Sequence, residues 1–94
     1  MNYLMKNYNP IKISFNHGDG CYLYTDKGEK YFDAISGLGV CGIGHSNSQI
    51  SKVINDQSKK LLHTSNLFNI KNQEILAKKL CKISKMNSAF FCNS

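Results

Sequence analysis

The sequence of 94 residues has no arginine, so its 12 basic side chains are all lysines, and only six acidic residues oppose them. The resulting formal net charge of +6 attracts phosphate groups. Arginine, however, is the residue type that reads guanine and binds phosphate through two parallel hydrogen bonds. The lysines are also spread along the chain from Lys6 to Lys85. We therefore expect no nucleic-acid partner.

Other absences narrow the class of protein further. No apolar run approaches the roughly 20 residues of a membrane-spanning helix, and the N-terminus lacks the apolar segment and cleavage site of a signal peptide. The four cysteines form no C-x-x-C pair, and the three histidines are too scattered for a metal site that is local in sequence. We expect a cytoplasmic protein with no membrane partner and no metal.

The first half of the chain has β-strand patterns. Residues 11–15 alternate apolar and polar side chains, which predicts a short half-buried strand, and Gly18 and Gly20 then indicate a turn. The runs 21–24 and 30–33 predict a hairpin around Thr25-Asp26-Lys27-Gly28-Glu29, with Gly28 in the left-handed conformation.

The second half has helical patterns. Ser46 followed by Gln49 is a capping-box pattern with Ser46 as the cap, and the apolar spacing of Ile50, Val53, Ile54, Gln57 and Leu61 predicts a helix of about fourteen residues after it. A second helix is predicted over residues 72–84. The run Ser88-Ala89-Phe90-Phe91-Cys92 is apolar throughout, which is typical of a strand buried on both faces of a sheet.

Two stretches could carry chemistry. Residues 37–42 match G-x-G-x-x-G, but the predicted helix begins about five residues too late for a dinucleotide site, so the loop either lines another ligand's pocket or is a connector. His45, directly after this loop, is interpreted as a packing or capping residue rather than a base. Asn93-Ser94 follow the last predicted strand, where a hydroxyl and free backbone N–H groups could bind an anion such as phosphate.

Several segments together resemble the class III pyridoxal-phosphate aminotransferases. The hairpin from Gly18 to Asp33 resembles their G-x-G-x-x-L-x-D-x-x-G-x-x-Y-x-D signature, and Gly44-His45 resembles the Gly-His before their first long helix. His63-Thr64-Ser65-Asn66-Leu67-Phe68 and Phe90-Phe91-Cys92-Asn93-Ser94 resemble segments of the acetylornithine aminotransferase branch. Thr25 departs from the signature, in which an aspartate is usual, and Asp26 follows it.

The resemblance implies an α/β fold, the N-terminal part of the aspartate aminotransferase-like fold: a hairpin, two helices and the first buried strand of the large domain. Residues 1–47 are assigned to the small domain and residues 48–94 to the start of the large cofactor domain. The implied cofactor is pyridoxal 5'-phosphate, and Ser94 is the cofactor-binding residue. Substrate-binding positions are Tyr8, Leu38 and Val40. Ser65 and Asn66 correspond to a segment near the active site of the neighbouring subunit in a homodimer.

The implied activity is transfer of the δ-amino group of N-acetylornithine to 2-oxoglutarate, a step of arginine biosynthesis. No lysine here lies in a segment resembling that of the lysine that binds the cofactor covalently, so this segment has no catalytic residue and residues 1–94 alone are expected to be inactive. An apolar Leu38, where ornithine δ-aminotransferases have a tyrosine, favours an acylated substrate. The alternatives are a related ω-aminotransferase acting on succinylornithine, 4-aminobutyrate or ornithine, and a small basic binding module.

Overall fold

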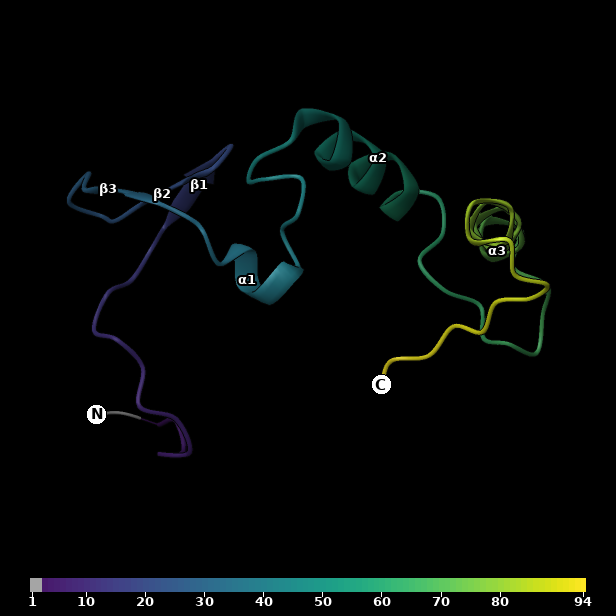
Figure 1. Cartoon of the computed structure of the whole chain (residues 1–94), viewed down its shortest axis with the longest axis horizontal. Coiled ribbons are helices and arrows are strands. Elements are labelled where there is room, and N and C mark those ends of the chain that lie inside the picture. The colour runs from purple at the N-terminus through teal and green to yellow at the C-terminus, as the bar shows by residue number, and fades with distance from the viewer. Residues whose placement is uncertain (1–2) are drawn as a thin grey trace. The chain divides into compact units, whose positions relative to one another are not determined.

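The computed structural model describes residues 3–94 (Figure 1). The chain divides into two compact units, of which the first ends at Asp56 and the second begins at Gln57. The elements in chain order are β1 (His17–Asp19), β2 (Tyr22–Tyr24), β3 (Lys30–Phe32), α1 (Ser36–Gly39), α2 (Ser48–Ser58) and α3 (Lys71–Ser84).

The three strands form one antiparallel sheet in the order β1-β2-β3. Gly18 lies opposite Leu23, and Leu23 lies opposite Tyr31. Aromatic side chains line up across the strands: the rings of Tyr22 and Phe32 meet edge to face at 5.9 Å, and His17 stacks on Tyr24 at 4.7 Å. Such cross-strand pairs stabilise a small sheet that has little else to pack against.

The turn between β2 and β3 is built on Thr25, the one described residue that is buried. Its Oγ1 accepts a hydrogen bond from the Glu29 backbone N–H at 3.2 Å and donates one to Glu29 Oε2 at 3.0 Å. Gly28 has φ +79°, a left-handed conformation that costs glycine little. The predicted hairpin is therefore confirmed, and threonine satisfies the turn where relatives were expected to have aspartate.

The glycine-rich segment after β3, which the sequence predicts to be a loop, contains the short turn α1. Ser36, Gly37, Leu38 and Gly39 all have positive φ, of 49°, 63°, 60° and 84°. Four consecutive left-handed residues make a tight reversed turn, which the Cys41 N–H closes by donating to the Ser36 carbonyl at 2.8 Å. Glycine adopts this conformation freely, whereas Leu38 does so at a cost of about 1–2 kcal/mol.

The helix α2 begins one residue later than the capping-box pattern predicted. Asn47 Oδ1 accepts hydrogen bonds from the backbone N–H groups of Gln49 and Ile50, at 3.0 and 3.1 Å. Asn47 is therefore the N-cap. Ser46, the predicted cap, instead donates its hydroxyl to the Gly18 carbonyl and so ties the start of α2 to β1. The helix spans 11 residues rather than about fourteen.

The second predicted helix is confirmed as α3, which begins one residue earlier than expected and ends at Ser84 as predicted. Lys85 follows it in the left-handed conformation, with φ 59° and ψ 28°. A left-handed residue after the last helical turn is a common helix ending, usually made by glycine. No helix among residues 3–94 combines the length and the apolar character needed to cross a membrane.

Two predicted strands are wrong. Residues 11–15 pair with no strand in the described chain, and β1 lies further along at His17–Asp19, where Gly18 belongs to the strand rather than to a turn. Residues 88–92 are likewise unpaired, and Phe90 is 89% exposed. An apolar pattern becomes a strand only when a ladder partner is available, and residues 3–94 offer none. No apolar side chain in these residues is buried.

Candidate functional site

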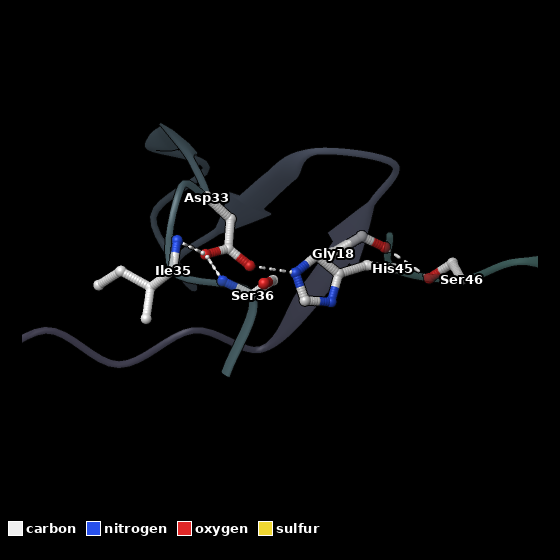
Figure 2. Close-up of polar contacts among 6 residues, drawn as sticks. All are labelled: Gly18, Asp33, Ile35, Ser36, His45 and Ser46. Carbon is white, nitrogen blue, oxygen red and sulfur yellow. Dashed lines mark hydrogen bonds and ion pairs between the residues drawn. The ribbon is translucent and has the colours of Figure 1, made fainter. Parts of the chain in front are cut away.

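A cluster of polar contacts in the first unit joins the residues just after β3 to those just before α2 (Figure 2). The two oxygens of the Asp33 carboxylate have different partners. Oδ1 accepts hydrogen bonds from the backbone N–H groups of Ile35 and Ser36, at 3.0 and 2.8 Å. Oδ2 contacts Nε2 of His45 at 2.6 Å. One carboxylate therefore fixes both the beginning and the end of residues 34–45.

These contacts favour the ionised form of the carboxylate. The side chain of Asp33 is only 8% exposed and that of His45 is 20% exposed. The hydrogen bond from His45, followed by that from the Ser36 N–H, lowers the pKa of Asp33 below its ordinary value of 3.8. Asp33 is therefore a charged acceptor over the whole physiological pH range, and it holds the imidazole in one orientation.

The backbone of His45 is also anchored. Its N–H donates to the Gly20 carbonyl at 2.8 Å, and the Gly20 N–H donates to the His45 carbonyl at 3.1 Å, an isolated antiparallel bridge. Two glycines allow the approach. A Cβ on Gly18 would lie 2.6 Å from Cβ and Cγ of His45, and a Cβ on Gly44 would lie 2.9 Å from the Gly20 carbonyl oxygen. Gly18 is therefore required by contact alone, whereas Gly44, at φ +86°, is required by contact and by conformation.

A cavity of about 140 Å³ adjoins the pair, lined by Gly20, Cys21, Asp33, Ser36, Cys41, Gly42, Gly44 and His45. Its polar groups are largely engaged with one another, because the Asp33 carboxylate already accepts three hydrogen bonds. No group of three or more metal-binding side chains lies together among residues 3–94. Both carboxylate oxygens of Asp33 are therefore engaged within the loop, and His45 Nε2 is held by one of them.

The predicted substrate-binding residues of the first unit are all exposed. Leu38 lies within the reversed turn α1, and Val40 directly follows it. The two residues are 91% and 82% exposed, respectively. Tyr8 lies outside any helix or strand and is 83% exposed. The structure therefore brings Leu38 and Val40 together on one loop, whereas Tyr8 comes from the N-terminal segment.

The remaining predicted residues lie in the second unit. Asn66 lines a pocket of about 370 Å³ together with Phe90, Phe91 and the first turns of α3. Ser65 is partly buried with φ +75°, and its Oγ accepts a hydrogen bond from the Leu67 N–H at 3.3 Å. Ser94 is exposed and is not among the residues that line this pocket.

Sequence reasoning missed the role of Asp33. It treated this residue only as the last position of a strand and as part of a resemblance. The available signal was an aspartate directly before a chain reversal, because aspartate side chains commonly accept hydrogen bonds from backbone N–H groups two or three residues ahead. Its second partner, His45, is 12 residues away and has no such local signal.

Comparison with known proteins defines the family. The family described as Aminotransferase class-III matches residues 3–94, and the chain therefore belongs to the class III aminotransferases. Among the relatives, the acetylornithine aminotransferase of Prochlorococcus marinus subsp. pastoris is 48% identical over 97% of this chain and 22% of its own length. The acetylornithine aminotransferase of Nitrosomonas europaea is 42% identical over 100% of this chain and 24% of its own length.

Solved structures agree in fold. The N-acetylornithine aminotransferase of Stenotrophomonas maltophilia K279a matches 90% of this chain and 24% of its own, with a TM-score of 0.83 and 32% identity. The ornithine δ-aminotransferase of Plasmodium falciparum matches with a TM-score of 0.85 at 24% identity, over 92% of this chain and 23% of its own, which is a likeness of fold alone. The chain thus spans about a quarter of the length of the relatives it matches, and the aminotransferase fold expected from the sequence is confirmed at that level.

Proposed function

We propose that this chain is the N-terminal part of a pyridoxal-phosphate-dependent transaminase that transfers the δ-amino group of N-acetylornithine to 2-oxoglutarate. The observation that carries the proposal is the 48% identity, over nearly the whole chain, to a relative named acetylornithine aminotransferase. The exposed apolar pair Leu38 and Val40 supports it, because an acylated amine presents an uncharged group to its binding site, whereas free ornithine presents a second ammonium.

The residues at the end of the described chain fit the cofactor in their chemistry. Asn93 and Ser94 are exposed and carry an amide and a hydroxyl, both of which can donate to phosphate oxygens. We assign Ser94 to phosphate binding. When bound, pyridoxal phosphate supplies the aldehyde that accepts an amino group and the conjugated ring that withdraws electrons. The lysine to which the cofactor is attached is not provided by residues 1–94, and these residues alone are therefore expected to be inactive.

The other residues act on substrate and subunit contacts. Leu38 and Val40 contact the acyl group, Tyr8 approaches the substrate from the N-terminal segment, and Ser65 and Asn66 lie near the active site of the neighbouring subunit in a homodimer. Residues 1–47 belong to the small domain and residues 48–94 to the large one. The enzyme is cytoplasmic and contributes to arginine biosynthesis.

The test is to express the complete reading frame that encodes these residues, whose product we call the full-length protein. We expect it to form glutamate from N-acetylornithine and 2-oxoglutarate, with a higher kcat/KM for N-acetylornithine than for ornithine, succinylornithine or 4-aminobutyrate. A higher kcat/KM for one of the other three amines changes the substrate assignment. Absence of transamination with all four contradicts the proposal.

The cofactor assignment has a matched pair of variants. Replacing Ser94 with alanine removes a hydrogen bond to a charged phosphate, which is worth about 1.5–3 kcal/mol, or roughly 10–100-fold in cofactor affinity. Ser88 is also exposed and lies in the same terminal segment, so Ser88→Ala is the control. Cofactor absorbance after dialysis measures retention. Equal retention by the two variants contradicts the role of Ser94.

A further inference from the structure

We propose that Asp33 and His45 are positioning residues for amino-donor recognition: together they fix both ends of residues 34–45 and thereby set where Leu38 and Val40 meet the acyl group. This inference rests on the proposed function. Neither side chain is assigned a contact with substrate or cofactor, so their effect is exerted through the loop between them.

The first anchor is the three-way bond of Asp33. Its Oδ1 orients the N–H groups of Ile35 and Ser36, which are the residues that lead into the reversed turn (Figure 2). Because Ser36 is the first of the four left-handed residues, the orientation of its backbone determines the direction of the turn that follows. Removal of the carboxylate frees the entry to the turn and, at the same time, the ring of His45.

The second anchor is His45. Its backbone forms the bridge to Gly20, and its ring lies against Gly18. The position of His45 is therefore set by β1 and by Gly20, the residue directly after β1. The contact of 2.6 Å between Nε2 and Asp33 Oδ2 connects this sheet-bound residue to the end of β3. The loop is consequently closed at its base by a side-chain pair as well as by backbone bonds.

Hydrogen bonds within the loop make the positions of Leu38 and Val40 depend on the positions of the two anchors. The Cys41 N–H donates to the Ser36 carbonyl at 2.8 Å, and the Leu38 N–H donates to the Ile35 carbonyl at 3.0 Å. These bonds fix the turn internally and leave the side chain of Leu38 91% exposed. A non-glycine residue held in a left-handed conformation is found where the surrounding structure imposes it, often at functional sites. A stiff turn on a fixed base is a means of presenting two apolar side chains at a defined point.

The test is steady-state kinetics on the full-length protein with N-acetylornithine and with ornithine as amino donors. We expect Asp33→Ala and His45→Ala to lower the ratio of the two kcat/KM values, acetylated over free, by about tenfold, because a displacement of about 1 Å in a positioning element costs up to about a hundredfold. The change falls mainly on the KM for N-acetylornithine, whereas the KM for 2-oxoglutarate, which has no acyl group, changes less than about twofold.

Milder variants keep the test valid if the alanine proteins fail to fold. Asp33→Asn retains an oxygen for the N–H groups of Ile35 and Ser36 and weakens only the contact with His45, so we expect an intermediate ratio. His45→Gln retains a donor that can reach the carboxylate, so we expect partial rescue relative to His45→Ala. Thr25→Val is the control: it removes hydrogen bonds of similar number from the far end of the hairpin, and we expect it to leave the ratio unchanged.

The outcomes separate the two proposals. A wild-type protein without transaminase activity contradicts the proposed function. An active wild type whose substrate ratio is the same in Asp33→Asn, His45→Gln and Thr25→Val overturns the positioning role alone. Variants that lose activity equally with both donors also overturn it, because this is the result expected of a residue that only maintains the fold.

Discussion

Residues 33–46 and residues 63–94 are stabilised in different ways. In the first region, side-chain contacts join residues that are distant in sequence: Asp33 meets His45 across 12 positions, and Ser46 meets Gly18 across 28. In the second region, the side-chain hydrogen bonds described for residues 63–94 join residues no more than four positions apart. The first region is therefore fixed by tertiary contacts, and the second by local structure.

The difference shows what each kind of contact can achieve. Local hydrogen bonds and an amphipathic pattern are enough to define α3, but they do not bury its apolar face. Ile75, Leu76 and Leu80 remain 46%, 47% and 44% exposed. Most helical stability in proteins comes from packing of such a face rather than from helix propensity. We therefore expect α3 to depend on an apolar surface that the second unit does not itself provide, whereas the Asp33–His45 region holds its own geometry.

The largest effect is expected when residues 1–94 are studied alone. With no buried apolar side chain among residues 3–94, the hydrophobic term that makes unfolding cooperative is nearly absent. Far-ultraviolet circular dichroism in urea should show a gradual loss of helix, in contrast to a steep transition in the full-length protein. A sigmoidal transition of the isolated chain, with a slope of about 1 kcal/mol per molar or more, contradicts this expectation.

The next effect compares two glycines at the bridge between Gly20 and His45. Gly44→Ala places a Cβ 2.9 Å from the Gly20 carbonyl oxygen at φ +86°, so both overlap and strain oppose it. Gly20→Ala, at φ +56° with no atom within 4 Å, meets strain alone. In the full-length protein we expect costs of about 2–3 kcal/mol and about 1 kcal/mol, respectively.

Hydrogen exchange of the Gly20 and His45 amides measures these costs directly, because both N–H groups form the bridge. In Gly20→Ala the corresponding amide of the new alanine is followed. Equal acceleration by the two substitutions means that the close approach of Gly44 does not matter, and it contradicts the contact argument.

The stabilisation from the Asp33 contacts should disappear in acid. The pKa of Asp33 is lower in the folded protein than its ordinary value of 3.8, so the folded state favours the ionised form. The contribution of the ionised Asp33 to the free energy of unfolding is complete above pH 3.8, and it is lost as the pH falls through the lowered pKa of the folded state. We expect the difference in urea midpoint between the wild-type full-length protein and Asp33→Asn to shrink over that range. A difference that is constant with pH contradicts the role of the charge.

The same distinction between local and distant contacts explains what the sequence could predict. The turn at Gly28 and the ends of α3 were predicted to within a residue, because their signals lie within a few positions. The contact between Asp33 and His45 was not predicted, since no local pattern joins residues 12 apart. The strand predicted at 88–92 failed for the opposite reason: its pattern was clear, but its ladder partner is absent from residues 3–94. The cofactor and substrate roles of Ser94, Tyr8 and Leu38 stay predictions.

The smallest effect is expected at the end of α3. Lys85 has φ 59° and ψ 28°, a conformation that glycine adopts without the cost of about 1 kcal/mol carried by other residues. We expect Lys85→Gly to stabilise the last turn of α3 by up to about that amount. The control is Lys82→Gly, because Lys82 lies inside the same turn in helical conformation, where glycine costs about 1 kcal/mol. Hydrogen exchange of the amides at the end of α3 should therefore slow in the first variant and accelerate in the second. Acceleration in both variants would contradict a strain cost at Lys85. It would also mean that local contacts stabilise the second region less than its hydrogen bonds indicate.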